Sequence, residues 1–174
     1  MKLLCTIQHY DSIVFMRIVN AHLYVPLCRF FRLVSKTADG SLYVLAVLGA
    51  AWQGGLSNSF SQVVLGAFLI ERPVYFVLKN SFKRNRPQAA LTHFKSVIVP
   101  QDQFSFPSGH TSAAFMMATL GSNACPALTF PLFFWAAGVG FSRVLLGVHF
   151  PSDVLVGATL GVSIAYISLQ QVAL

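Results

Sequence analysis

Five apolar stretches of the chain are long enough, or nearly long enough, to cross a membrane. They cover residues 41–52, 59–79, 108–123, 129–147 and 151–171. A helix needs roughly 20 residues to cross the hydrocarbon core of a bilayer. Turn signals separate the stretches, among them Asp39-Gly40 and the charge-free segment 53–58. We therefore predict an all-α fold, a polytopic membrane helical bundle with about five spanning helices.

The first 40 residues follow a different pattern, in which charged positions are spread among apolar ones. Residues 1–20 include Lys2, Asp11 and Arg17, and residues 21–36 continue in the same way. Both segments are too polar to span, so we predict amphipathic helices that lie in the membrane interface. The alternative is that they pack across the other helices. In either case residues 1–174 form one domain, with residues 41–174 as its transmembrane core.

Composition supports a membrane environment. The chain is 55% hydrophobic and only 10% charged, against about 25% charged for an ordinary soluble domain. Its mean hydropathy is +0.65 and its formal net charge is +7. The basic residues lie beside the apolar stretches, which favours anionic lipid head groups or a phosphorylated substrate over nucleic acid as partners. The three cysteines are scattered, and we expect them to be unpaired: Cys5, Cys28 and Cys125.

Three polar segments interrupt the apolar pattern, at residues 79–87, 107–110 and 142–153. Counting the crossings places the end of the second span, the start of the third, the end of the fourth and the start of the fifth at the same membrane surface. Residues 80–108 form a loop that is long for a compact protein, and such loops are usually functional. We therefore predict that the three segments converge in one site.

Three cations of these segments could bind phosphate oxygens. Arg86 and Arg143 offer a planar fork of donors, and Lys79 offers a point charge. The alternative for each is a cation at the end of a span whose head group reaches the interface. We interpret three further cations in that second way, or as attracting anionic lipid: Lys83, Arg84 and Lys95.

The other two segments hold histidines. Ser108, Gly109 and His110 stand at a predicted helix start, where free backbone amides favour an anion. Ser108 could equally be an ordinary helix cap. His149 and Asp153 are four residues apart, and Asp153 could hold the imidazole Nδ1 proton so that Nε2 is free to attack. The alternative is that Asp153 only complements the dipole of its helix.

The acidic residues are few and dispersed: Asp11, Asp39, Glu71, Asp102 and Asp153. None forms a pair with the spacing of metal ligands, whereas a divalent-metal phosphatase needs clustered oxygen ligands. We therefore expect no metal and no cofactor. Glu71 and Arg72 lie within the second span, and for Glu71 we expect a supporting or helix-packing role rather than direct catalysis. The alternative is that Pro73 bends this span and both charges reach a hydrated cleft.

Taken together, the three segments resemble the signature of the type 2 phosphatidic acid phosphatase family. The matching residues are Lys79 with Arg86-Pro87, Pro107-Ser108-Gly109-His110, and Ser142-Arg143 with His149 and Asp153. No motif position departs from the family pattern, and the order of the three motifs is that of the family. Residues 1–40 carry no part of the resemblance.

The resemblance implies a metal-independent membrane enzyme that hydrolyses a lipid phosphate or diphosphate. His149 would be the nucleophile that forms a phosphohistidine, Asp153 would orient it, and His110 would protonate the leaving oxygen and then activate water. The five phosphate ligands would be Lys79, Arg86, Ser108, Gly109 and Arg143. Substrates that fit are undecaprenyl diphosphate, phosphatidic acid, phosphatidylglycerophosphate and lipid A phosphate.

Two other functions remain open at this point. A phosphotransferase would use the same phosphohistidine and pass the phosphoryl group to an alcohol. A non-catalytic lipid-binding protein should lack part of the histidine machinery, whereas this chain has both histidines.

The side of the membrane that the site faces is a separate question. Of the twelve Lys and Arg residues, five lie in residues 1–40 and five in residues 79–95, while segments 53–58 and 121–127 have none. The positive-inside rule would place the site in the cytoplasm. The family resemblance instead implies a multi-pass protein of the bacterial inner membrane with its site facing the periplasm. We predict the periplasmic side, because three of these cations are needed for phosphate.

Overall fold

The structure is a computed structural model that describes residues 2–54, 59–100 and 102–172. Its elements in chain order are α1 (Lys2–Val19), α2 (Tyr24–Lys36), α3 (Ser41–Gly54), α4 (Ser59–Phe82), α5 (Pro87–Ala90), α6 (Gly109–Ala124), the 3-10 turn η1 (Pro126–Leu128), α7 (Thr129–Leu145) and α8 (Pro151–Val172). Within these residues there is no strand, only an isolated bridge between Asn85 and Phe104. The predicted all-α membrane bundle is confirmed.

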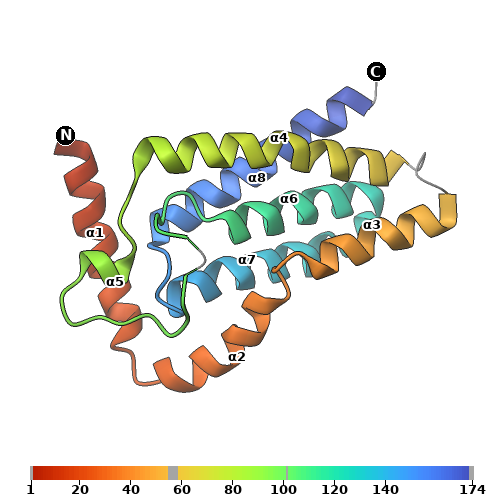
Figure 1. The fold of residues 1–174 in the computed structure, drawn as a ribbon. Coiled ribbons are helices and arrows are strands. Elements are labelled where there is room, and N and C mark those ends of the chain that lie inside the picture. The colour runs from red at the N-terminus through yellow and green to blue at the C-terminus, as the bar shows by residue number, and fades with distance from the viewer. Residues whose placement is uncertain (1, 55–58, 101, 173–174) are drawn as a thin grey trace.

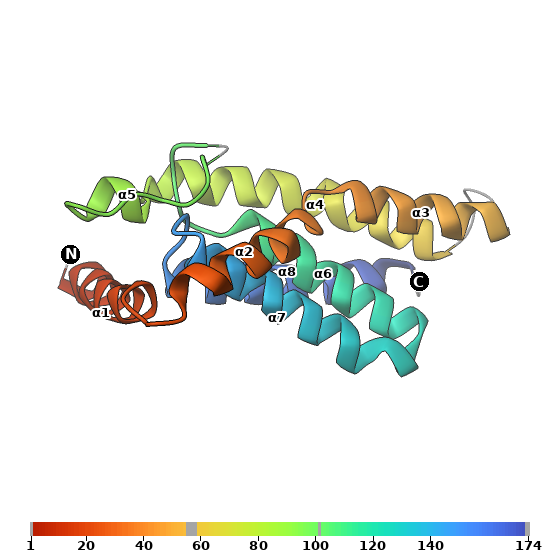
Figure 2. The same ribbon diagram turned by 90° about the horizontal axis from the view of Figure 1, so that it is seen from below.

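The five predicted spans are all helices and run along the long axis of the molecule (Figure 1). Seen from below, α3 and α4 form one layer and α6, α7 and α8 form the other (Figure 2). Among the described helices, α4, α8 and the segment Pro126–Leu145 are long and apolar enough to cross a membrane. Segments Thr6–Val19 and Tyr24–Trp52, bent by 105° at their break, would add a fourth crossing.

The span count of about five is therefore an approximation. Helix α3 has 14 residues and α6 has 16, which is short against the roughly 20 residues that a crossing requires. The predicted turn at 53–58 lies largely outside the described residues, because α3 continues to Gly54 and the description resumes at Ser59.

Helix α6 forms the centre of the bundle and packs most closely against α8. Two glycines of α8 make this approach possible: a Cβ at Gly157 would lie 2.5 Å from the Ser108 carbonyl oxygen, and one at Gly161 would lie 2.1 Å from that of Ser112. Backbone therefore lies directly against the face of α8. The buried residues of α6 include Ala114, Met116 and Leu120.

Helix α1 crosses the end of the bundle at which α5 and the α7–α8 loop also lie (Figure 1). One face of α1 exposes apolar side chains, including Tyr10 and Val14, as expected for an interfacial helix. The opposite face is docked on the protein, where Phe15 is fully buried with ring contacts to Phe94 and Phe150. The two interpretations of the N-terminal segment are thus combined, because α1 is amphipathic and also packs across the bundle.

Candidate active site

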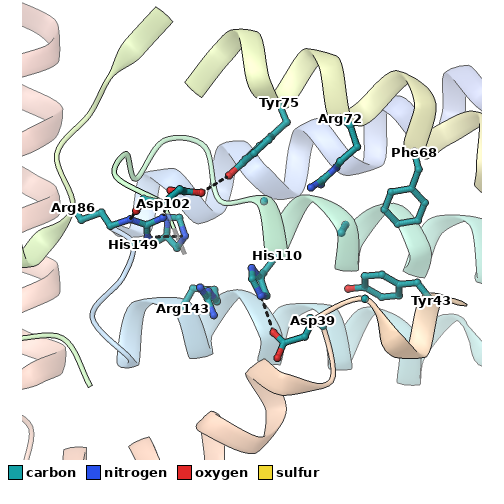
Figure 3. Close-up of a pocket in the computed structure, with 14 residues that line it drawn as sticks. Asp39, Tyr43, Phe68, Arg72, Tyr75, Arg86, Asp102, His110, Arg143 and His149 are labelled. Atoms are coloured by element: carbon teal, nitrogen blue, oxygen red, sulfur yellow. Dashed lines mark hydrogen bonds and ion pairs between the residues drawn. The ribbon is translucent and has the colours of Figure 1, made fainter. Parts of the chain in front are cut away.

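A cavity of about 290 Å³ lies at the end of the bundle near α1 and is shown in Figure 3. Its lining includes five of the eight predicted site residues: Arg86, Gly109, His110, Arg143 and His149. They come from the α4–α5 loop, the start of α6, the end of α7 and the α7–α8 loop. The predicted convergence of the three polar segments is confirmed.

His149 lies in the loop between α7 and α8 and is buried. Its Nδ1 lies 2.6 Å from the carbonyl oxygen of Ser105. A carbonyl can only accept, so Nδ1 carries the proton and donates this hydrogen bond. Its Nε2 lies 3.4 Å from Nη1 of Arg86. Burial, reinforced by the positive charges of Arg86 and Arg143 and opposed by Asp153, lowers the pKa of His149 from 6.5 to about 4. The imidazole is therefore neutral at neutral pH, with its lone pair on Nε2.

Asp153 does not make the direct hydrogen bond to His149 that we predicted. Its Oδ2 lies 3.8 Å from His149 Nδ1, which is beyond hydrogen-bond distance. Oδ2 instead accepts a hydrogen bond from the backbone N–H of Phe150 at 2.8 Å, and Oδ1 accepts one from Nη1 of Arg84 at 2.6 Å. The carbonyl of Ser105, contributed by the long loop, occupies the place expected for the carboxylate. Asp153 thus holds the turn that carries His149.

Asp102 bridges two of the predicted phosphate ligands. Its Oδ1 lies 2.5 Å from Nη2 of Arg86, and its Oδ2 lies 2.7 Å from Nζ of Lys79. Burial alone would raise the pKa of Asp102, but the contacts with the two cations outweigh it and hold this pKa below its usual range. Lys79 also contacts the Tyr75 hydroxyl and does not line the cavity. Asp102 was not among the predicted site residues, because it belongs to none of the three motifs.

Arg143 and His110 lie beside each other in the cavity lining (Figure 3). Arg143 donates from Nη1 to the Ser35 hydroxyl at 2.7 Å, while its buried Nε has no hydrogen-bond partner among the described residues. His110 Nε2 lies 2.9 Å from Oδ1 of Asp39, in the turn between α2 and α3. Asp39 is a second residue that the motifs did not indicate.

Ser108, a predicted phosphate ligand, is not among the residues that line the cavity. Its hydroxyl lies 2.8 Å from that of Thr111, and its N–H donates to the Asp153 carbonyl at 3.0 Å. Gly109 does line the cavity, and a Cβ there would lie 2.9 Å from the ring of Tyr75. The absence of a side chain at Gly109 thus allows the close approach of that ring.

Comparison with known proteins places this site in a family. A family model described as the PAP2 superfamily matches residues 60–174. The chain belongs to the PAP2 superfamily. This superfamily is the type 2 phosphatidic acid phosphatase family that the motifs predict. The matched region holds the three motifs and every helix from α4 onward.

Curated PAP2-type relatives are phosphatases by name. The decaprenylphosphoryl-5-phosphoribose phosphatase of Mycobacterium tuberculosis is 33% identical over 128 residues, which is 71% of this chain and 67% of the relative. The phosphatidylglycerophosphatase B of Bacillus subtilis is 34% identical over 116 residues, which is 60% of this chain and 54% of the relative.

Solved PAP2 structures agree in fold. The crystal structure of Aquifex aeolicus LpxE has a TM-score of 0.79 and 30% sequence identity, covering 90% of this chain and 93% of that one. A transmembrane PAP2 type phosphatidylglycerolphosphate phosphatase from Bacillus subtilis has a TM-score of 0.74 at 23% identity, covering 95% and 85% of the two chains.

Two charged residues of the PAP2 chain, Arg84 and Glu71, lie outside the cavity lining and form ion pairs. Arg84, predicted to be an interfacial cation, is partly buried in ion pairs with Asp11 and Asp153, each at 2.6 Å. That prediction was wrong. The local sequence gives no sign of the pairing, because the partner Asp11 lies 73 residues earlier in the chain. Glu71 is fully buried, pairs with Arg72 and accepts the Ser112 hydroxyl at 2.7 Å. This contact between α4 and α6 agrees with the predicted helix-packing role.

Proposed function

We propose that this protein is an integral-membrane, metal-independent phosphatase that hydrolyses a phosphate or diphosphate monoester of a membrane lipid through a phosphohistidine on His149. One observation carries the proposal: a neutral imidazole lines the same cavity as two arginines and a second histidine. His149 Nε2 has the lone pair, since Nδ1 donates to Ser105. Arg143 lines the cavity with an Nε–H that has no protein partner in the described structure.

The reaction then has two steps. In the first, Nε2 of His149 attacks phosphorus, the bond from phosphorus to the lipid oxygen breaks, and His110 gives its proton to the departing oxygen. In the second, water attacks the phosphohistidine, His110 takes a proton from it, and inorganic phosphate leaves. Arg86 and Arg143 stabilise the charge on the phosphoryl oxygens in both transition states.

A lipid substrate is supported by an apolar groove that adjoins the cavity. The groove has a volume of about 340 Å³ and lies between α3 and α4, lined by Val44, Leu48 and Leu65 among others. It shares Gly40, Tyr43 and Phe68 with the cavity. An acyl or prenyl chain in this groove would place its phosphate at the histidines.

Metal independence is supported by the state of the carboxylates. Each of the five acids of the chain contacts a basic side chain: Asp11 and Asp153 contact Arg84, Asp39 contacts His110, Glu71 contacts Arg72, and Asp102 contacts Lys79 and Arg86. A divalent cation at the phosphate site would need oxygen ligands that these ion pairs already use.

The proposed location is a bacterial inner membrane with the cavity open to the periplasm. The helices that are long and apolar enough to span support the membrane, and the bacterial PAP2-type relatives support the source. The cations near the cavity line it or form ion pairs beside it. The count of basic residues at this end therefore reflects the proposed site as well as the orientation in the membrane.

The decisive experiment is to trap the phosphoenzyme. We expect the wild-type protein, rapidly quenched during turnover of p-nitrophenyl phosphate carrying a labelled phosphoryl group, to hold acid-labile, base-stable label on histidine. The His149→Ala protein should hold none and should release no phosphate from any substrate. Label trapped in the His149→Ala protein would reject the assignment of the nucleophile.

The same preparation identifies the substrate and the acceptor. A panel of undecaprenyl diphosphate, phosphatidic acid, phosphatidylglycerophosphate and lipid A phosphate ranks the lipids by kcat/KM. Turnover in the presence of a primary alcohol separates hydrolysis from phosphoryl transfer, since a transferase forms the alcohol's phosphate ester in place of inorganic phosphate.

A further inference from the structure

Arg84 lies where α1, the loop after α4 and the start of α8 meet. Its Nη2 donates to Asp11 Oδ2 and its Nη1 to Asp153 Oδ1, both at 2.6 Å. Its Nε and Nη2 donate to Gln8 Oε1 at 3.0 and 2.8 Å, and its Nη1 donates to the Ser152 hydroxyl at 2.7 Å. All five N–H donors of the guanidinium are thus used, and only 16% of the side chain is exposed.

Asp11 is the α1 side of this network and also binds the start of α8. Its Oδ1 accepts the backbone N–H of Ser152 at 3.0 Å, and its Oδ2 contacts the Ser152 hydroxyl. Ser152 is the second residue of α8, so this amide is one that the helix itself leaves without an acceptor. A carboxylate there is also favoured by the helix dipole.

The far side of the network leads to the nucleophile. Asp153 is fully buried, and its Oδ2 accepts the N–H of Phe150, the residue that follows His149. The Arg84 guanidinium lies over the Phe150 ring, 4.6 Å from its centroid. The turn that carries His149 is therefore held by Asp153 and Arg84 together.

We propose that Asp11 is a positioning residue of the reaction: through Arg84 it fixes Asp153 and the turn that carries His149, so that α1 is part of the active site. This inference rests on the proposed function. It concerns a residue outside the part of the chain that the PAP2 superfamily model matches, which begins at residue 60.

The physical basis is the sharing of one guanidinium by two buried carboxylates. Asp11 and Asp153 bind different nitrogens of Arg84, and this fixes the rotation of its planar fork. Without the charge of Asp11, the fork keeps Gln8 and Ser152 as neutral acceptors, and Asp153 remains as its anionic partner. The guanidinium is then drawn toward Asp153, and the position of Asp153 shifts with it. A displacement of about 1 Å at a reacting group can lower a rate about 10²-fold.

The test uses the full-length protein in detergent and the substitution Asp11→Asn, which keeps an oxygen for the Ser152 amide. We expect phosphoenzyme formation from p-nitrophenyl phosphate to slow by about 10- to 100-fold. Competitive inhibition by inorganic phosphate, the product of the reaction, should stay within about twofold, because Arg86 and Arg143 are untouched. The control is Arg17→Gln, which removes a charge from an exposed position of the same helix and should match the wild type in both measurements.

A double-mutant cycle tests whether Asp11 acts through Arg84. We expect the protein with both Asp11→Asn and Arg84→Gln to form phosphoenzyme as slowly as Arg84→Gln alone, since both changes remove the same coupling. Multiplied effects would overturn the inference. It is also overturned if Asp11→Asn lowers only the unfolding temperature, or weakens inhibition by inorganic phosphate as much as it slows the reaction. A wild-type protein that forms no phosphoenzyme rejects the proposed function, and the positioning role with it.

Discussion

At the scale of single residues, the charge state of His149 links chemistry to stability. Burial and the nearby Arg86 and Arg143 lower its pKa to about 4, whereas the unfolded chain has the ordinary value of 6.5. As the pH falls below 6.5, the unfolded state takes up the proton first. The free energy of unfolding therefore decreases between pH 6.5 and 4, by on the order of 3 kcal/mol at about 1.4 kcal/mol per pKa unit.

We expect this loss to depend on His149 itself. Thermal unfolding of the wild-type protein and of His149→Gln should be compared in detergent from pH 7 to pH 4. Titration of the carboxylates is common to both proteins and cancels in the difference. The wild type should lose more stability than the variant over this range. Parallel pH curves would show that His149 has an ordinary pKa.

The two histidines are expected to differ in their dependence on the leaving group. In the proposed mechanism His110 supplies a proton to the leaving oxygen, and such help is worth roughly 10²–10⁴-fold for a lipid alkoxide. p-Nitrophenolate departs readily without it. His110→Ala should therefore form phosphoenzyme far faster from p-nitrophenyl phosphate than from a lipid phosphate, as measured by rapid quench. An equal loss with both substrates would leave His110 as a phosphate ligand only.

The motif residues could be predicted from sequence because their chemical types and spacing are specific. Five of them line the cavity. Their actual partners could not be predicted. The Ser105 carbonyl at His149 is backbone, which every residue has, and Asp39 at His110 lies 71 residues away in the chain. Such contacts depend on how loops fold back, which the spacing of residues does not record.

At the scale of helices, the contact between α6 and α8 sets the position of His110 and Asp153. Each of these residues lies in the first turn of its helix. The two helices approach closely at Gly157 and Gly161 of α8, where the carbonyls of α6 and of its N-cap Ser108 lie against the glycine faces. A side chain at either position would push the two catalytic ends apart.

We expect Gly161→Ala to destabilise the protein by about 1–3 kcal/mol, the usual cost of overfilling a packed contact. Its Cβ would lie 2.1 Å from the Ser112 carbonyl oxygen, and backbone cannot move aside cheaply. The unfolding temperature in detergent measures the effect. Gly49→Ala in α3 is the matched control, because nothing lies within 4 Å of its Cβ and alanine favours a helix over glycine. Equal unfolding temperatures for the two variants would contradict the packing argument.

The helices themselves could be predicted because long apolar runs between turn signals leave few alternatives. The docking of α1 could not. Its pattern predicts an amphipathic helix, but the same pattern serves a helix that lies on lipid and one that lies on protein. The contacts of Phe15 with Phe150 and of Asp11 with Arg84 show that α1 lies on protein. These partners are distant in the sequence, so the pattern of α1 alone does not reveal them.

At the scale of the whole molecule, basic residues concentrate at the end that holds the cavity. Lys79, Arg84, Arg86 and Arg143 are each buried in the site or in its supporting ion pairs. The proposed phosphate site and the docking of α1 therefore account for their positions. The positive-inside rule relates the count of Lys and Arg in short loops to orientation, and these four cations have a second reason to lie at this end.

The orientation follows from labelling single cysteines at the two ends of the bundle. Lys95 is exposed in the loop at the cavity end, and native Cys125 is exposed just after α6 at the other end. With Cys5 and Cys28 replaced by serine, a membrane-impermeant maleimide added to intact cells should label Lys95→Cys and spare Cys125. Permeabilised cells should label both, which confirms that each thiol is reactive. The reverse pattern in intact cells would place the site in the cytoplasm, on the side that the raw count of charges favours.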